Sequence, residues 1–208
     1  SVPSLQQTAY VVGKCSQFAF PVVWIFLIKR RKNSHDISSK FNGLGLGLGT
    51  GLVILLATLL MYYGLIKPLG AFAGEPTEEI CDKVADFDVD SATKYFFLGA
   101  FYSLVHAFLE EYYWRWFVFG ELRRLITVPT AIAISSVGFM AHHVIVLANY
   151  FGFLSPWTWF FSLAVATGGI IWAWLYHRTG ALLATYISHS LVDAAIFIIG
   201  FDLIRSIL

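Results

Sequence analysis

Six long apolar segments run through this 208-residue chain, and each is about as long as a helix that crosses a lipid bilayer. They cover residues 9–28, 44–66, 95–119, 129–150, 157–176 and 181–204. Because the bilayer core offers no water, a spanning segment must satisfy its own backbone N–H and C=O groups, and a helix does so. No segment alternates apolar and polar residues as the strands of a membrane barrel do. The sequence therefore predicts an all-α fold, a polytopic transmembrane helix bundle with about six spanning helices.

The composition supports a membrane protein and argues against nucleic acid as a partner. Hydrophobic residues make up 58% of the chain and charged residues 13%, whereas a soluble domain carries about 25% charged residues. The formal net charge is only +1, so no strong electrostatic field favours nucleic acid. The chain has no Cys-x-x-Cys pair, which excludes a zinc site built on one. We expect a single transmembrane domain over residues 1–208, in contact with lipid and not with nucleic acid.

Basic residues are distributed unequally between the two ends of the predicted spans, and this predicts the orientation of the chain. Eight of them fall on one side: Lys29, Arg30, Arg31, Lys32, Lys40, Arg123, Arg124 and Arg178. Four fall on the other: Lys67, Lys83, Lys94 and Arg205. Because the side richer in lysine and arginine is usually cytoplasmic, we expect both termini on the outer side. The acidic stretch between residues 67 and 94 is then an outer loop or a short surface helix.

Ionisable side chains occur inside three of the predicted spans, where each costs about 2.5–3.5 kcal/mol to insert. They are Glu110, Glu111 and Arg115 in the third span, His142 and His143 in the fourth, and His189 and Asp193 in the sixth. Such residues usually face the interior of a bundle and serve its function. Buried pairs can also act only as packing contacts. Their occurrence on three separate spans favours one shared site.

Helical spacing indicates how the third span arranges its charges. Glu111 and Arg115 are four residues apart, so they share a helix face and can pair. Glu110 is rotated by about 100° from Glu111, so we expect it to face an internal cavity. We expect His106, on the outer half of the same span, to pack near an interface.

The same reasoning applies to the two spans that carry histidines. Phe139 and His143 are four residues apart, as are His189 and Asp193, so each pair shares a helix face. His142 is rotated by about 100° from His143, so only one of these two histidines can face the cavity well.

A glutamate and a histidine beside a water molecule form a general-base arrangement. The carboxylate takes a proton from the water as the water attacks a carbonyl, one histidine orients that water, and another stabilises the oxyanion. This predicts hydrolysis of a peptide bond in or near the bilayer. One glutamate and two or three histidines could instead hold zinc, although the His-Glu-x-x-His pattern is absent.

Three motifs on different spans resemble those of one protease family. Residues 110–115 have the form E-E-x-x-x-R, residues 139–143 the form F-x-x-x-H, and residues 189–193 the form H-x-x-x-D/N. In their order and their placement they resemble the CPBP family, the CAAX-protease and bacteriocin-processing intramembrane endopeptidases, also called the abortive-infection family. The motif-bearing core covers residues 95–201.

The resemblance implies a glutamate-type endopeptidase without a cofactor, and the residues fit a metal-free mechanism better than a metal-dependent one. It implies that Glu110 is the base, that His143 helps to hold the water, and that His189 and Asp193 form the oxyanion pocket. The supporting residues are Glu111, Arg115 and Phe139. The prenyl-protease branch has asparagine where this chain has Asp193. An ionised aspartate repels an oxyanion, so Asp193 must be protonated or must act by orienting His189.

The implied substrate is a membrane-embedded, membrane-associated or lipid-linked peptide, and the implied location is the inner (plasma) membrane of a prokaryotic cell, which the chain crosses several times. A second hypothesis is a non-catalytic membrane scaffold or a bacteriocin self-immunity protein. A third is a proton-coupled transporter, since buried glutamate and histidine also relay protons, but the sequence shows no inverted repeat. The motifs do not indicate an oligomeric state.

Overall fold

The computed structural model describes residues 5–24, 27 and 41–208, and every regular element within these residues is helical. The elements are α1 (Leu5–Val23), α2 (Leu44–Met61), η3 (Tyr62–Ile66), α3 (Glu75–Asp86), α4 (Ala92–Ala100), η4 (Phe101–His106), α5 (Ala107–Glu111), η5 (Tyr112–Phe119), α6 (Gly120–Leu122), α7 (Val128–Phe151), α8 (Pro156–Thr179) and α9 (Leu182–Ile204). The elements labelled η are π-helical. This architecture confirms the predicted all-α fold.

Within the described residues, four helices are long and apolar enough to cross a membrane: residues 44–66 (α2 continued by η3), α7, α8 and α9. They coincide with four of the predicted spans. The predicted span at 95–119 lies within a helical run from α4 to α6, in which α-helical and π-helical turns alternate. The first predicted span, 9–28, overlaps α1 and extends partly outside the described residues. The basic residues at 29–32 and 40, on which the predicted orientation depends, lie outside them as well.

Proline and glycine set the ends of the hairpin that α7 and α8 form. Pro129 lies in the first turn of α7, where a missing N–H leaves no helical hydrogen bond unmade. Gly152, with a φ of 79°, ends that helix. Ser155 then caps α8 by accepting a hydrogen bond of 3.3 Å from the backbone N–H of Trp157. Gly180 ends α8 in the left-handed conformation, which glycine adopts without steric strain.

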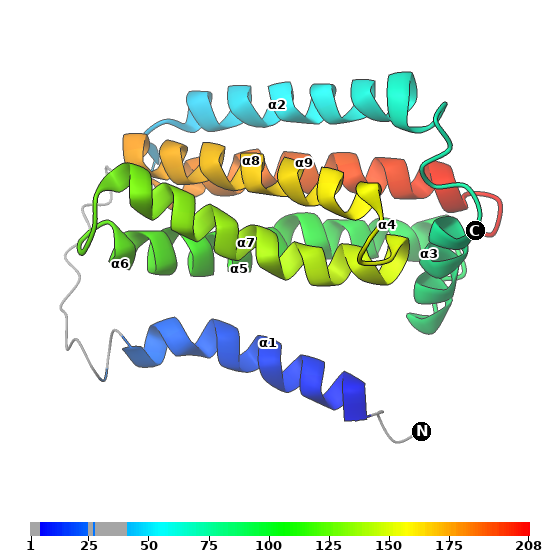
Figure 1. Ribbon diagram of the computed structural model, residues 1–208, viewed down its shortest axis with the longest axis horizontal. Helices are drawn as coiled ribbons and strands as arrows, with labels where there is room; N and C mark the ends of the chain where they lie inside the picture. Colours follow the sequence, from blue (N-terminus) through cyan, green and yellow to red (C-terminus); the bar gives the residue numbers. More distant parts are fainter. Residues whose placement is uncertain (1–4, 25–26, 28–40) are drawn as a thin grey trace.

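The glycine run at the start of α2 lets this helix pack closely along α9 (Figure 1). A Cβ added at Gly47 would overlap the backbone of Ala184, and one added at Gly51 would lie 2.8 Å from Cα of Ser188. Gly49, between these two positions, has nothing within 4 Å of its added Cβ. Small residues serve such close contacts in membrane bundles, where burial from water drives no packing.

The three motif-bearing spans meet in the middle of the bundle. α9 contacts α2, α8 and α5, and α7 contacts α8 and η5. In Figure 1, α2 forms one edge of the bundle and α1 lies along the opposite side, where it contacts η5. The order of the helices therefore places α5, α7 and α9 together in the interior.

The acidic stretch forms α3, which packs across the end of the bundle against α7 and α9 (Figure 1). A small apolar cluster anchors it: Val84, Val89, Tyr95 and Ile204. Glu75 and Glu78 lie in its first turn and Lys83 lies in its last, an arrangement that suits the helix dipole. The stretch is thus a short helix, one of the two forms predicted for it.

Candidate active site

The two consecutive glutamates lie on α5, one short α-helical segment between the π-helical segments η4 and η5. A π-helical turn bonds residue i to i+5, so residues across it do not follow the regular 100° step of an α-helix. Both side chains are buried, Glu110 with 3% and Glu111 with 0% of its surface exposed. Short π-helical interruptions occur frequently at functional sites. The direction in which α5 presents its glutamates is therefore a property of the fold and not of the spacing.

Glu111 joins the third span to the sixth. Its Oε1 atom lies 2.8 Å from Nδ1 of His189 and 3.3 Å from Nη1 of Arg115. A carboxylate has only acceptor oxygens, so Nδ1 of His189 is the donor in the shorter contact. The ion pair predicted from the four-residue spacing is present, and Glu111 also has a partner on another helix.

The guanidinium of Arg115 lies between aromatic rings. Its Cζ atom is 4.6 Å from the ring centroid of Phe139 and 5.1 Å from that of Trp172. Arg115 is 2% exposed, and a cation over an aromatic face at a desolvated site gains about 2 kcal/mol or more. Phe139, the first residue of the second motif, thus contacts the ion pair that supports the site.

Three imidazole nitrogens surround the carboxylate of Glu110. The Nε2 atoms of His106 and His142 lie 3.8 Å and 4.0 Å from its Oε1, and Nε2 of His189 lies 3.8 Å from its Oε2. These separations exceed the 2.7–3.2 Å or so of a direct hydrogen bond. Glu110 is therefore a buried carboxylate with three imidazole nitrogens close by and none of these three within direct hydrogen-bonding distance.

The fourth span presents its two histidines differently from the expectation. Nδ1 of His143 donates a hydrogen bond of 2.9 Å to the carbonyl oxygen of Phe139, so Nε2 of the neutral ring carries the lone pair. His142, which lies outside the family motif, is the one whose Nε2 comes to 4.0 Å from Glu110. The rings of His142 and His143 meet edge to face with 5.0 Å between their centroids. Of these two histidines it is thus His142 that comes near Glu110, whereas the predicted His143 bonds to the backbone of its own helix and meets the ring of His142.

His106 was expected to pack near an interface, and the structure corrects this. Its Nε2 atom lies 3.8 Å from Oε1 of Glu110, and its ring packs against Tyr102 at 5.2 Å between centroids. His106 and Glu110 are four residues apart, which is the signal in the sequence that could have found this contact.

The ring of His189 is fixed by stacking on Trp172. The two rings are 4.0 Å apart between centroids and inclined by 18°. The indole Nε1 of Trp172 in turn donates a hydrogen bond of 3.1 Å to Oγ of Ser188. Neither motif spacing nor composition singled out Trp172, since it lies on α8, the one spanning helix of the core that carries no motif.

The second nitrogen of His189 faces two carboxyl groups. Nε2 lies 3.5 Å from Oδ1 of Asp193 and 3.8 Å from Oε2 of Glu110. The structure therefore brings the predicted pair of His189 and Asp193 together. Because Nδ1 donates to Glu111, a neutral ring presents a lone pair at Nε2, and only the cationic ring donates a proton there.

No group of three or more His, Cys, Asp or Glu side chains within residues 5–24, 27 and 41–208 is arranged to hold a metal ion. The distances around Glu110 agree, because two ligands of zinc that each lie about 2.0–2.1 Å from the ion are usually closer together than 3.8 Å in tetrahedral geometry.

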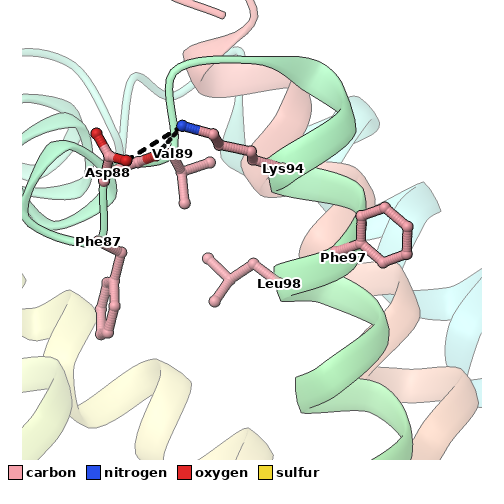
Figure 2. A pocket seen from close by; sticks show the side chains of 6 residues that line it. All are labelled: Phe87, Asp88, Val89, Lys94, Phe97 and Leu98. Carbon is pink, nitrogen blue, oxygen red and sulfur yellow. Dashed lines mark hydrogen bonds and ion pairs between the residues drawn. The ribbon is translucent and has the colours of Figure 1, made fainter.

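A surface hollow of about 480 Å³ lies elsewhere, at the start of α4 (Figure 2). Its lining residues are Phe87, Asp88, Val89, Lys94, Phe97 and Leu98. Lys94 donates to Asp88 at 3.2 Å and to Asp90 at 3.0 Å. The hydrogen bond from Lys94 lowers the pKa of Asp90, and the bonds to the two aspartates raise the pKa of Lys94. The hollow thus has a charged rim, and it contains none of the motif residues.

The comparisons with known proteins concern the same part of the chain as the site. A family model described as type II CAAX prenyl endopeptidase Rce1-like matches residues 92–195. This half of the chain contains all three motifs, whereas α1 and α2 precede it. No curated protein and no solved structure matches the chain.

Proposed function

The chain belongs to the Rce1-like family of type II CAAX prenyl endopeptidases, and on that premise we propose that it is an intramembrane endopeptidase whose base is Glu110. The observation that carries the proposal is the surroundings of this glutamate. Glu110 is 3% exposed, and its carboxylate has three imidazole nitrogens at 3.8–4.0 Å. A base in such a position can take the proton of a water molecule held beside it.

In the proposed reaction, the oxygen of this water bonds to the carbon of the scissile carbonyl while one of its protons moves to Glu110. A tetrahedral intermediate with a negatively charged oxygen results. The bond between carbon and nitrogen then breaks as Glu110 passes its proton to the leaving nitrogen. General acid–base catalysis of this kind contributes about 10²–10⁴-fold to the rate.

We propose that His189 stabilises the negatively charged oxygen from its Nε2 atom. That role requires the cationic ring, because Nδ1 already donates to Glu111 at 2.8 Å. The carboxyl group of Asp193, 3.5 Å from Nε2, supports the cation and orients it. Asp193 then acts through His189 and does not face the oxyanion itself, which suits an aspartate better than direct contact does.

The proposed substrate is a peptide in or beside the bilayer, with a lipid-modified C-terminal region as the family description suggests. The site lies among helices that are long and apolar enough to span a membrane, which fits a multi-pass membrane protein. We further propose the prokaryotic inner membrane as its location. A substrate anchored by a lipid chain would reach the site from the bilayer.

Cleavage of a defined peptide tests the proposal. The protein is reconstituted in liposomes with a prenylated peptide that ends in Cys-aliphatic-aliphatic-Xaa, and the products are identified by intact mass. We expect cleavage by the wild type and by Glu78→Gln, an exposed glutamate of α3 that serves as the matched control. We expect Glu110→Gln to fold normally and to lose cleavage, because an amide cannot accept the proton of water. Full activity of Glu110→Gln would refute the assignment of Glu110 as the base. If Glu110→Gln does not cleave the peptide but keeps the cellular phenotype of the wild type, a scaffold or immunity role is favoured.

A further inference from the structure

α1 brings a lysine to the Glu110 site from outside the matched residues 92–195. Nζ of Lys14 lies 3.4 Å from Nε2 of His142, and that same Nε2 lies 4.0 Å from Oε1 of Glu110. Both distances are measured from Nε2 of His142. Nζ of Lys14 therefore lies no farther from Oε1 of Glu110 than the sum of the two distances. Lys14 also interacts electrostatically with Glu110.

Aromatic contacts hold α1 in the position that this approach requires. Phe18 meets Tyr113 edge to face with 6.4 Å between centroids, and Phe20 meets Phe117 at 5.6 Å. The ammonium of Lys14 also lies 5.7 Å from the centroid of the Phe18 ring.

The contact decides which nitrogen of His142 carries the proton. A lysine ammonium has only N–H donors, so Nε2 of His142 accepts and its proton lies on Nδ1. In the opposite tautomer, Nε2–H would point a donor at Glu110 and compete for the lone pairs that a general base needs. With Lys14 present, these lone pairs stay available to water. The positive charge also attracts the carboxylate, and a low-dielectric surrounding strengthens that attraction.

We propose that Lys14 is a positioning residue, which acts through His142 to keep the Glu110 carboxylate available for the proton of the attacking water. The inference rests on the proposed function and extends the site to a helix that the family match does not include. It assigns α1 a part in catalysis besides packing.

Kinetics of Lys14 variants on the same prenylated peptide probe test the role. We expect Lys14→Met to lower kcat by about tenfold while KM stays within about twofold, because the base and not the substrate contact is affected. Lys14→Arg should recover most of the rate, since a guanidinium also has only donors. The double variant Lys14→Met/His142→Gln should be no slower than His142→Gln alone, because residues that act through one contact are not additive.

Cross-linking tests the placement of α1 without any need for activity. In a Cys15→Ser/Cys81→Ser background, a short bis-maleimide should bridge Lys14→Cys to His142→Cys. The matched control is Val23→Cys with His142→Cys, since Val23 is exposed and lies about 14 Å farther along the same helix. This control pair should not cross-link.

The outcomes separate the inference from the proposed function. If Glu110→Gln is inactive while Lys14→Met keeps the wild-type kcat, changes KM alone, or is not rescued by arginine, the positioning role is overturned and the proposed function stands. Failure of the Lys14–His142 cross-link overturns it as well. If the wild type does not cleave, or Glu110→Gln cleaves fully, the proposed function fails and takes this inference with it.

Discussion

Nδ1 of His189 donates a hydrogen bond of 2.8 Å to Oε1 of Glu111, and this contact joins two residues 78 positions apart in the chain. It leaves the other nitrogen of the ring facing Glu110 at 3.8 Å and Asp193 at 3.5 Å. Two consecutive glutamates thus meet the two nitrogens of one imidazole. Under the proposed mechanism this gives a physical reason for the paired glutamates of the motif: Glu111 orients His189, and Glu110 is the base.

Loss of Arg115 should destabilise the protein more than loss of the whole ion pair. Arg115→Met leaves the fully buried Glu111 without its counter-charge, and breaking a buried pair in this way costs about 3–5 kcal/mol. The double variant Arg115→Met/Glu111→Gln removes both charges and should recover part of that loss. Thermal unfolding in detergent measures the stability of the single and the double variant against the wild type. A single variant as stable as the wild type would contradict the assigned role of the pair.

The two histidines outside the motifs should matter for turnover. His106→Gln and His142→Gln each remove an imidazole Nε2 from the surroundings of Glu110, at 3.8 Å and 4.0 Å. We expect each change to lower kcat by about tenfold, less than the 10²–10⁴-fold that a general base supplies. His177→Gln, an exposed histidine near the end of α8, is the control and should keep the wild-type rate. Wild-type kcat in both variants would show that these rings do not assist the base.

Asparagine should replace Asp193 with little loss. Its amide oxygen can accept from Nε2 of His189 as the carboxyl group does, at the 3.5 Å separation seen here. We expect Asp193→Asn to stay within about tenfold of the wild-type kcat, whereas Asp193→Leu, which keeps the size and loses the acceptor, should fall about 10²-fold or more. Equal rates for the two variants would refute a polar role for residue 193.

The close packing of α2 on α9 makes a prediction about stability. Gly47→Ala places a methyl group against the backbone of Ala184, which cannot move aside as a flexible side chain can. Overpacking of this kind costs about 1–3 kcal/mol, so the unfolding temperature should fall. Gly49→Ala is the matched control, because nothing lies within 4 Å and alanine favours the helix. The packing interpretation fails if both variants unfold at the same temperature.

Chelation should leave peptide cleavage unchanged, because the proposed base is a side chain that activates water without a metal ion. The measurement compares the cleavage rate with and without a strong chelator, followed by addition of zinc. A rate that falls with the chelator and returns with zinc would instead support the metal-dependent alternative. The Glu110→Gln variant in the same series separates loss of the base from loss of an ion.

The sequence by itself determined the long helices and many of the residues of the candidate active site. Apolar length predicts α2, α7, α8 and α9, because a segment without water must form its own hydrogen bonds. Proline, serine and glycine mark the ends of α7 and α8 locally. The four-residue spacing correctly predicts that Glu111 pairs with Arg115, since both lie on one helix face.

Only the tertiary structure decided which side chains meet around Glu110. Spacing fixes faces within one regular helix, but the rotation of one helix against another follows from packing across the whole interface. Glu110 and Glu111 are separated by an ordinary α-helical step within α5, yet both approach His189, because Nδ1 of its ring meets Glu111 and Nε2 faces Glu110. The packing of separate helices likewise brings His142 near Glu110. It also brings Trp172 of α8 and Lys14 of α1, which lie outside the motifs, to the site.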